Sequence, residues 1–498
     1  WDVVEALFPA GVIDGMFGAY GSLLEWLSDA GTDWRAVPPV LLPADQAAVR
    51  ARVNATGVPL PAGSLHAGVF AQAARAPERP ALLGDPEGAV SYGALAERAL
   101  RVAALLAARG VAPGDPVAVT LPRGADQVAA VLGILAAGGV YVPVGVDQPA
   151  ARRARMHRVA GVRHVVTRPG GTAPDADVLA VDIAEAGAFA PLAAPVPRGS
   201  EEAAYVIFTS GSTGEPKGVE VTHGAAQNTV ADITRRFGVG PEDRVLAVSA
   251  LDFDLSVYDL FGPLGVGGAV VLVGEEDRRE APRWHALMAG HGVTLWNSAP
   301  ALMEMLLAVP GALPGLRLAL LSGDWIGLEL PARLRERSPG CRFVALGGAT
   351  EAAIWSNALE VGTVPPGWRS IPYGFPLANQ RYRVVDGLGR DCPDWVPGEL
   401  WIGGAGVATG YRGDAATTAV RFVEREDGRW YRTGDLGRYW PDGTLEFLGR
   451  ADHQVKVRGH RIELGEVEAA LEAHPSVAQA VVVAVGGRGR RRLAGFVT

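Results

Sequence analysis

Small hydroxyl residues and glycines gather between an apolar run and a lysine in YVIFTSGSTGEPKGV, residues 205–219. Glycine leaves the backbone unobstructed, so successive N–H groups of such a loop can approach an anion closely. Four hydroxyls add further donors: Thr209, Ser210, Ser212 and Thr213. The common P-loop reads G-x-x-x-x-G-K-[ST], whereas here Pro216 precedes Lys217 and a glycine follows it. The pattern indicates a phosphate-binding loop of another kind.

The overall composition excludes several classes of function. A chain of 498 residues is long enough for two or three domains with sizeable cores. Its formal net charge of -8 and pI near 5.7 argue against a nucleic-acid partner held by general electrostatics. The two cysteines, Cys341 and Cys392, lack CxxC spacing and indicate neither a disulfide framework nor a zinc site.

One uncharged stretch, residues 128–146, is long enough to suggest a membrane span. The Gly138–Gly139 pair and Pro143 interrupt it, so we predict a buried helix, a tight turn and a strand. No membrane partner is expected. The chain begins at Trp1 without a methionine and no signal peptide is visible, so we expect a piece of a longer, cytoplasmic protein.

The elements that position the loop follow an α/β pattern. From about residue 62 to 360, helical and β-branched segments alternate, as in parallel sheets flanked by helices. After about residue 380 the strands shorten, with Gly and Asp turns typical of a small barrel or meander. A further small unit begins near Asp452 with a strand and a helix. We interpret the basic tail, residues 486–498, as a solvated turn rather than a binding patch.

Six ordered segments are similar to those of the adenylate-forming superfamily, and most closely resemble adenylation domains of nonribosomal peptide synthetases. They are LAAGGVYVPV (135–144), FTSGSTGEPKG (208–218), GGATE (347–351), GELWIGGAGVATGY (398–411), YRTGD (431–435) and GRADHQVKVRGHRIELGEVE (449–468). The resemblance implies an adenylation core over 61–451, made of a large part with parallel sheets and helices and a small β-barrel-like part. It also implies a small, mobile α+β C-terminal subdomain, of which 452–498 is an incomplete start, with Asp452 as the hinge. Residues 1–60 resemble the end of a heterocyclization domain and its linker.

The resemblance also implies roles for individual residues. The loop would hold the β- and γ-phosphates of ATP while a carboxylate attacks the α-phosphate, chemistry that needs donors and cations rather than a protein nucleophile. Thr209, Lys217 and Glu351 would be catalytic, and Glu351 would hold Mg²⁺. Other ATP contacts would come from Ser210, Gly211, Ser212, Thr213, Gly214, Asp435 and Arg450, the last two at the ribose. The activated acid would then pass to the phosphopantetheine of a carrier-protein domain.

The activated acid can be inferred from the positions that match the family's specificity residues. These are Asp254, Leu255, Tyr258, Asn297, Leu320, Ser322, Leu346, Ile354 and Trp355, a set similar to the cysteine code of thiazoline-forming synthetases. A carboxylate at Asp254 suits an α-ammonium group, bulky rings leave little room, and apolar walls suit a thiol. We therefore expect L-cysteine, for a siderophore or similar thiazoline product. Serine or another small amino acid is the alternative.

The chain departs from the family in two places. The position of the usual adenine-stacking aromatic is Gly347, so adenine must be packed by other residues, with Leu346 one candidate. The chain also stops before the final motif and its catalytic lysine, so alone it should adenylate slowly. Either an inserted domain follows Thr498 in the parent protein, or the parent continues uninterrupted. Two rival functions are an acyl- or aryl-CoA ligase and a largely non-catalytic binding platform.

Overall fold

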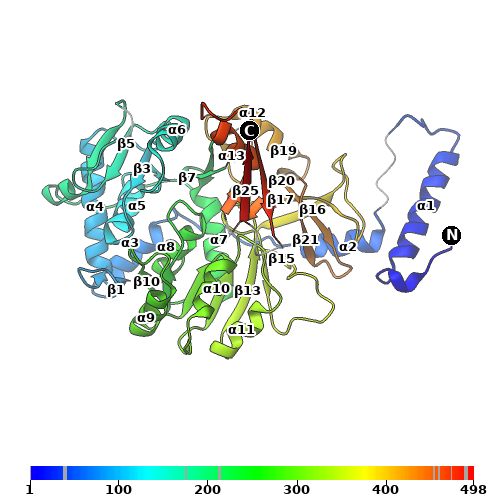
Figure 1. The fold of residues 1–498 in the computed structure, drawn as a ribbon, viewed down its shortest axis with the longest axis horizontal. Coiled ribbons are helices and arrows are strands. Elements are labelled where there is room, and N and C mark those ends of the chain that lie inside the picture. The colour runs from blue at the N-terminus through cyan, green and yellow to red at the C-terminus, as the bar shows by residue number, and fades with distance from the viewer. Residues whose placement is uncertain are drawn as a thin grey trace.

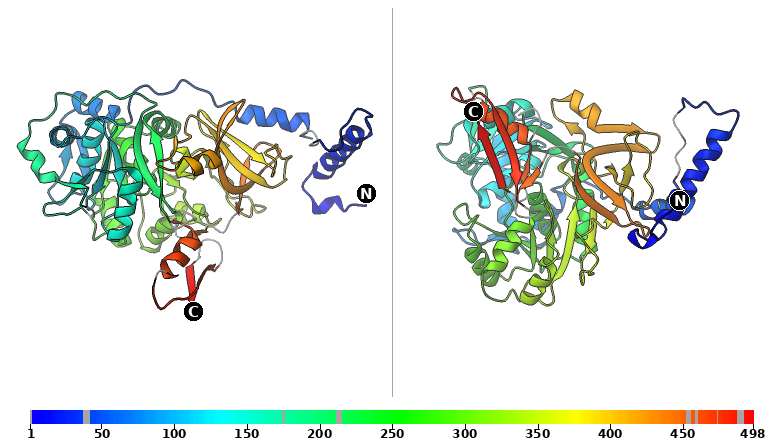
Figure 2. Two further views of the ribbon diagram at one scale, coloured as in Figure 1. Left: turned by 90° about the horizontal axis from the view of Figure 1, so that it is seen from above. Right: turned by 45° about the vertical axis from the view of Figure 1, so that its right-hand side comes forward.

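The computed structural model describes eight segments of the chain, which are 2–36, 42–173, 176–210, 215–451, 455–457, 460–472, 474–486 and 492–498. Predictions for Gly211, Ser212, Thr213 and Gly214 of the phosphate loop, and for the hinge at Asp452, fall outside these residues and remain predictions. Figures 1 and 2 show two large sheet layers with their helices, a separate antiparallel sheet and a small C-terminal unit.

The first large sheet is parallel at its centre and antiparallel at both edges. In the described residues it runs β15 (Phe375–Pro376), β14 (Asn357–Glu360), β13 (Arg342–Gly347), β12 (Leu318–Leu321), β11 (Leu295–Ser298), β9 (Arg244–Ala247), β10 (Ala269–Leu272), β1 (Pro80–Leu83) and β2 (Val90–Ser91). Strands β10, β11 and β12 are buried along their whole length. This matches the continuous apolar sequences of β10 and β12, whereas β11 also buries Asn297 and Ser298.

The second large sheet carries the phosphate loop at one side. Its order within the described chain is β18 (Gly410–Tyr411), β8 (Lys217–Thr222), β7 (Ala203–Thr209), β4 (Val140–Pro143), β3 (Pro116–Thr120), β5 (His164–Thr167) and β6 (Leu179–Asp182). Strands β7, β4, β3, β5 and β6 are parallel, whereas β8 turns back antiparallel to β7.

Helices cover and separate these sheets. They are α3 (Ala67–Arg75), α4 (Tyr92–Ala108), α5 (Ala125–Ala136), α6 (Ala150–Ala160), α7 (His223–Arg236), α8 (Leu255–Gly265), α9 (Ala281–His291), α10 (Pro300–Ala308) and α11 (Leu330–Arg337). Helix α5 is apolar on all sides and almost wholly buried, as expected for a helix inside the protein. It is followed by a turn at Gly138 (φ +81°) and by β4, which confirms the prediction for 128–146. No described helix has the length and apolar character needed to cross a membrane.

The antiparallel part after residue 380 confirms the predicted small barrel-like unit. Its strands are β16 (Gln380–Val385), β17 (Gly398–Gly404), β20 (Gly428–Tyr439) and β19 (Phe422–Arg425), with β21 (Leu445–Arg450) paired to β20, and α12 (Ala415–Arg421) precedes β19. Strand β20 is long enough to hydrogen-bond with β17, β19 and β21. This unit brings the YRTGD motif beside the large sheets.

The C-terminal unit contains β22 (Val455–Val457), β23 (His460–Ile462), α13 (Leu464–Glu472), β24 (Ala480–Val485) and β25 (Arg492–Val497). It projects from the body in Figure 2. The prediction of a solvated turn for the tail was wrong for residues 492–497. They form a strand antiparallel to β24, because the apolar residues after the arginine run pair with the valine-rich strand. Across the pair, Val482 faces Gly495.

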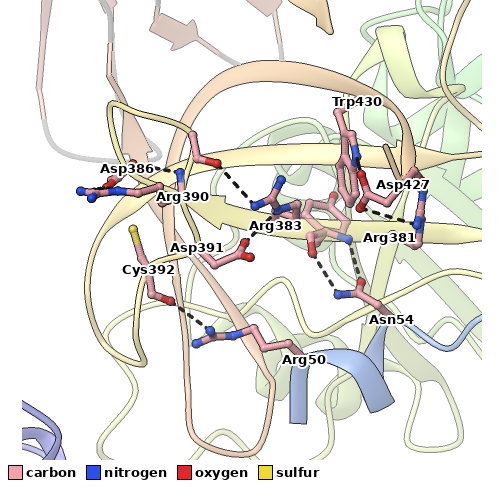
Figure 3. A network of polar contacts seen from close by, with 12 residues as sticks. Arg50, Asn54, Arg381, Arg383, Asp386, Arg390, Asp391, Cys392, Asp427 and Trp430 are labelled. Atoms are coloured by element: carbon pink, nitrogen blue, oxygen red, sulfur yellow. Dashed lines mark hydrogen bonds and ion pairs between the residues drawn. The ribbon is translucent and has the colours of Figure 1, made fainter. Parts of the chain in front are cut away.

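The N-terminal residues form two helices with different surroundings. Helix α1 (Val12–Ser28) has no buried residue and stands apart from the body (Figure 1). Helix α2 (Ala44–Val53) instead packs on the barrel-like unit. Figure 3 shows Arg50 of α2 donating to the carbonyl of Cys392 at 3.0 Å, and it is also paired with Asp394.

The chain after α2 continues the same contact. Asn54 donates from Nδ2 to the carbonyl of Tyr382 at 3.0 Å and accepts from the Tyr382 amide at 2.8 Å (Figure 3). Thr56 donates from its hydroxyl to the carbonyl of Gln380 at 2.6 Å. Residues 44–56 therefore pack against β16, although they precede the predicted start of the core at residue 61.

Two buried histidines should make stability fall in mild acid. Burial lowers the pKa of His66 to about 3, helped by His223, and lowers the pKa of His223 to about 4, helped by Arg198 although Glu202 opposes it. Both folded values lie below the ordinary 6.5, so the unfolded chain binds more protons. The stabilisation is full above pH 6.5 and is lost as the pH falls, by about 2 kcal/mol per histidine at pH 5.

Denaturant unfolding at pH 7 and pH 5 measures this loss. In a variant carrying His66→Gln and His223→Gln, the difference in unfolding free energy between the two pH values should shrink. An unchanged difference would show that other groups cause the acid sensitivity.

Candidate active site

The β7–β8 hairpin places Thr209 and Lys217 opposite each other across the mouth of the phosphate loop. Thr209 Oγ1 is buried and has no hydrogen-bond partner among the described residues. A glycine is required at position 218, because a Cβ there would come within 2.8 Å of Val206. The hairpin thus holds the Thr209 hydroxyl and the Lys217 ammonium at the two ends of the phosphate loop. Residues 211–214 of that loop are not among those that the structure describes.

Tyr411 connects Lys217 to Glu351. The ammonium of Lys217 lies 5.6 Å from the centre of the Tyr411 ring, and the Tyr411 hydroxyl donates to Glu351 Oε1 at 2.8 Å. The Glu351 side chain is fully buried. Strand β18, which carries Tyr411, pairs with β8, so the sheet brings Tyr411 close to Lys217. Glu351 comes from a short helix, Thr350–Ala352, that follows β13 of the other large sheet. The predicted lysine and glutamate are therefore close in space, although 134 positions apart in sequence.

Asp435 and Arg450 form a buried ion pair on neighbouring strands. They face each other in the β20–β21 register, and the guanidinium donates to Asp435 Oδ1 at 2.8 Å. The same Arg450 nitrogen donates to the Thr433 carbonyl at 2.9 Å. The two residues predicted to contact one sugar are thus adjacent, and the arginine is fixed toward the aspartate.

A single cavity of about 70 Å³ joins this ion pair to the predicted amino-acid site. Its lining consists of Phe253, Asp254, Leu255, Ser322, Gly323, Gly348, Ala349, Thr350, Ile354, Trp355, Thr433, Asp435 and Arg450. The Asp254 carboxylate is buried and accepts a hydrogen bond from the Thr350 hydroxyl at 2.8 Å. The cavity volume of about 70 Å³ is far below the roughly 300–1,000 Å³ of sites for drug-sized ligands. The cavity suits a small substrate next to the sugar of a nucleotide.

The backbone is strained where the chain enters the part of the cavity lined by Ile354 and Trp355. Ala353 and Ile354 have φ values of +52° and +73°, a left-handed conformation that is unusual for β-branched Ile354. Such strain is concentrated at functional sites. The turn directs Trp355 inward, where its Nε1 donates to Ser322 Oγ at 2.8 Å. This hydrogen bond fixes the indole and orients the Ser322 hydroxyl at the cavity.

Four of the predicted substrate residues are buried but do not line this cavity in the described structure. They are Tyr258, Asn297, Leu320 and Leu346. Tyr258 packs against Trp355, with ring centres 5.3 Å apart. Asn297 and Leu320 are partners on β11 and β12. These residues form a layer behind the wall, and a direct contact between them and substrate remains a prediction.

The space above Gly347 is filled by Tyr373. A Cβ at Gly347 would lie 2.9 Å from the side-chain amide of Asn357 and 3.0 Å from Cε1 of Tyr373, so these two side chains occupy the place that a larger side chain at 347 would need. Tyr373 stacks on Phe447, with ring centres 5.1 Å apart and planes 6° from parallel. Burial raises the pKa of Tyr373 strongly, with a further contribution from Asp435, which keeps the phenol neutral. An aromatic pair therefore lies near the Asp435–Arg450 pair without any aromatic residue at 347.

The residues present fit a magnesium ion held together with phosphates. Glu351 offers one buried carboxylate oxygen beside a lysine-bearing loop. Elsewhere in the described chain no group of three or more His, Cys, Asp or Glu is arranged to hold a metal. Mg²⁺ usually takes one or two carboxylates and completes its shell with phosphates and water, so one glutamate is compatible with the prediction.

Several residues of the site were not found from the sequence. Tyr411 is the last residue of the segment GELWIGGAGVATGY, so its position in an ordered motif was an available signal. Thr350 likewise lies inside GGATE, next to the predicted metal ligand. Tyr373 lies in no recognised segment, and only the packing against Gly347 reveals it.

The fold and the site define an adenylate-forming enzyme, and comparisons with known proteins agree. The model of the AMP-binding enzyme family matches residues 69–412, more than half of the chain. The chain belongs to this family and, within it, to the adenylation domains of nonribosomal peptide synthetases.

Two longer proteins are similar to nearly the whole of this chain. It is 54% identical over 491 residues to pyochelin synthetase PchE of Pseudomonas aeruginosa, covering 98% of this chain and 34% of PchE. It is 49% identical over 495 residues to phenyloxazoline synthase MbtB of a Mycobacterium species, covering 98% of this chain and 42% of MbtB. The chain thus spans less than half the length of these relatives.

A solved structure shows the same fold. The nonribosomal peptide synthetase FmoA3, in a form bound to alpha-methyl-L-serine-AMP, matches with a TM-score of 0.85 and 41% identity. The match covers 94% of this chain and 53% of FmoA3.

Proposed function

We propose that this chain activates L-cysteine with ATP, forming cysteinyl-AMP and pyrophosphate, as one module of a siderophore-type peptide synthetase. The observation that carries the proposal is the single cavity in which Asp254 lies close to the Asp435–Arg450 pair. One end offers a buried carboxylate for an ammonium group, and the other offers the residues expected at a ribose. A reaction that joins an amino acid to a nucleotide needs both ends in one space.

The adenylation step is proposed as follows. A carboxylate oxygen of cysteine attacks the α-phosphorus of ATP, a new carboxyl–phosphate bond forms, and the bond to the β-phosphate oxygen breaks. Pyrophosphate leaves with that electron pair. Lys217 would neutralise charge on the departing phosphates, and the Thr209 hydroxyl would donate to them. Glu351, held by Tyr411, would bind Mg²⁺, which supplies charge neutralisation when bound.

The cavity wall supports a small, weakly polar side chain. Leu255, Ile354 and the Trp355 ring are apolar, and the Ser322 hydroxyl is the polar group nearest to the indole. A thiol suits such a wall because it is soft and only weakly hydrogen-bonding. Asp254 argues against a fatty or aryl acid, because neither offers an ammonium group for a carboxylate at the cavity to bind.

Serine is the second candidate, and the relatives give it specific support. The name of MbtB refers to an oxazoline, a ring that contains oxygen where a thiazoline contains sulfur. FmoA3 was solved with an adenylate of a serine derivative. The Ser322 hydroxyl lines the cavity and could form a hydrogen bond with a substrate hydroxyl, but its oxygen already accepts a hydrogen bond from Trp355 Nε1. We therefore rank serine below cysteine.

The proposed partners are those that the resemblance to nonribosomal peptide synthetases implies. We propose that a carrier-protein domain receives the cysteinyl group on its phosphopantetheine thiol, and that a heterocyclization domain precedes residue 61 in the same protein. We further propose 61–451 as the adenylation core and 452–498 as the start of its C-terminal subdomain. Residues 44–56 precede this core and pack on its strand β16, so they would attach its N-terminal side to the preceding domain.

Amino-acid-dependent exchange of pyrophosphate into ATP tests the proposal. We expect the highest kcat/KM with L-cysteine, a lower value with L-serine, and little exchange with large aromatic or acidic amino acids. Preference for a large aromatic amino acid would contradict it. Exchange that depends on an aryl or fatty acid would instead favour the ligase alternative, and ligand binding without exchange would favour the platform alternative.

Tyr373 should matter for ATP and not for the amino acid. We propose that its ring, backed by Phe447, provides the aromatic surface for adenine that Gly347 lacks. Tyr373→Ala should raise the KM for ATP by about tenfold, because aromatic stacking on a base is worth roughly 1–3 kcal/mol. The KM for cysteine should stay within about twofold. Equal increases in both constants would indicate a general loss of structure instead.

A further inference from the structure

The first turn of helix α8 receives hydrogen bonds from a side chain on strand β11. Asn297 on β11 is fully buried, and its Nδ2 donates to the backbone carbonyl of Leu255 at 3.1 Å. The same nitrogen donates to Oδ1 of Asp259 at 2.9 Å, one turn further along α8. The side chain of Asp254, which precedes Leu255, has no capping bond to the helix. Asn297 therefore helps to hold this turn, together with Ser256, whose hydroxyl donates to the Leu251 carbonyl at 3.1 Å.

Asp259 controls the orientation of that amide. It is 1% exposed, and its Oδ1 accepts the second hydrogen bond of Asn297. Burial raises the pKa of Asp259 to about 8, although the hydrogen bond from Asn297 and the charge of Arg123 lower it. The group is therefore mostly neutral near pH 7. If the Asn297 amide were rotated by half a turn, its oxygen would face the Leu255 carbonyl, which can only accept, and that contact would repel.

The far side of Asp259 borders a second, separate cavity of about 30 Å³. Arg123 and Ser249 also line it, and the Arg123 guanidinium donates to the Val248 carbonyl at 2.9 Å. This volume exceeds the 10–15 Å³ or so that a water molecule requires. Asp259 thus lies between the layer behind the substrate cavity and a second interior pocket, and it is not among the residues that line the substrate cavity.

We propose that Asp259 and Asn297 are positioning residues that lock the first turn of α8, and so set the selectivity of the neighbouring cavity for a small amino acid. Asp254 and Leu255, which line that cavity, begin this turn. The proposal rests on the proposed function of the cavity. It gives Asn297 an indirect role in place of the predicted substrate contact. A shift of the turn would move the ammonium-binding carboxylate and one apolar wall together.

Three variants test the proposal by exchange kinetics on the full chain. Asp259→Leu removes the acceptor and should raise the KM for cysteine by about tenfold or more, with the KM for ATP within about threefold. Asp259→Asn keeps a neutral acceptor of the same shape, so the KM for cysteine in this variant should stay within about threefold of the wild-type value. Asn297→Asp keeps an oxygen toward any substrate but loses the donor, and should be as impaired as Asp259→Leu.

The double variant Asp259→Asn with Asn297→Asp provides the sharpest comparison. It exchanges donor and acceptor between the two positions, but it leaves the Leu255 carbonyl facing an oxygen. We expect it to remain impaired, whereas a simple pairwise contact would be restored. Asp243→Asn serves as a matched control, because Asp243 is a buried carboxylate that binds Arg317 and lies outside the cavity lining. It should lower the unfolding temperature without changing the cysteine KM.

Each outcome decides between specific explanations. Normal cysteine KM in Asn297→Asp would overturn the proposal and favour a direct substrate contact by the amide oxygen. Parallel loss of cysteine and ATP affinity with a lower unfolding temperature in every variant would reduce the pair to a structural role and also overturn it.

If the wild-type chain shows no amino-acid-dependent exchange, the proposed function fails first. If Asp259→Leu does not fold, the contrast between Asp259→Asn and Asn297→Asp still decides.

Discussion

Replacing Asp254 with alanine is expected to abolish most cysteine binding while leaving ATP binding nearly intact. The carboxylate is buried at the cavity and would pair with the substrate ammonium group. Removing one partner of a buried ion pair costs on the order of 3–5 kcal/mol, which corresponds to a loss of affinity of at least about a hundredfold. Calorimetric titration of cysteine and of ATP, each into wild type and variant, measures both effects.

Thr350→Val is the matched control for this prediction. It removes the hydroxyl that donates to Asp254 but keeps the carboxylate, so it should weaken cysteine binding much less than Asp254→Ala. Undiminished cysteine binding in Asp254→Ala would show that the amino acid binds elsewhere. Equal losses in both variants would show that the carboxylate acts only within its hydrogen bond to Thr350.

Lys217→Ala should produce the second large effect, on ATP and on the chemical step. The ammonium lies at the start of β8, beside the Tyr411 ring and across from Thr209. Loss of one preorganised charge that stabilises a transition state typically lowers the rate by about 10²–10³-fold. We expect a lower kcat and a higher KM for ATP in the exchange assay, with cysteine affinity within about threefold by titration.

Arg155→Ala provides the control for charge near the loop. Arg155 is half-exposed and lies 4.0 Å from Glu215, at the end of the phosphate loop. Its ion pair with Glu215 is a surface contact that contributes little to stability. The rate of ATP–pyrophosphate exchange should therefore be nearly unchanged. A Lys217→Ala variant that binds ATP normally but loses cysteine would contradict the assignment of the loop to phosphates.

Much of the site was predictable because its motifs act through local backbone. The segment FTSGSTGEPKG carries its hydroxyls and lysine within one hairpin, and YRTGD carries Asp435 on one strand. The order of strand and helix segments also predicted the parallel sheets, since a βα alternation leaves few other arrangements. Asp254, Ser322 and Trp355, which come from three separate segments, line one cavity, and their contact with substrate stays a prediction.

What the sequence did not reveal depends on contacts between distant segments. Nothing near Gly347 indicates that the Tyr373 ring fills the space beside it. Asp259 is not among the predicted site residues, and its burial and its hydrogen bond with Asn297 on β11 appear only in the structure. Arg50, in a segment interpreted as a linker, binds a carbonyl 342 positions away. Such pairs leave no local pattern, because each partner alone is compatible with many surroundings.

The same reasoning explains the error in the tail. A basic run with three consecutive arginines is typical of a solvated turn, and the charges dominated the interpretation of residues 486–498. The apolar residues after them pair with β24 over six positions, from Arg492 to Val497. Pairing with a strand that lies earlier in the chain outweighed the local charge.

The central claim is that one cavity joins cysteine to AMP, and direct detection of the product tests it most clearly. The protein is incubated with Mg²⁺, ATP and an equimolar mixture of the twenty common amino acids together with salicylate and a fatty acid, and the adenylates are identified by mass spectrometry. We predict cysteinyl-AMP as the main adenylate, with seryl-AMP as a minor product, and the loss of both in Asp254→Ala. An adenylate of salicylate or of the fatty acid as the main product, formed equally well by Asp254→Ala, would contradict the account.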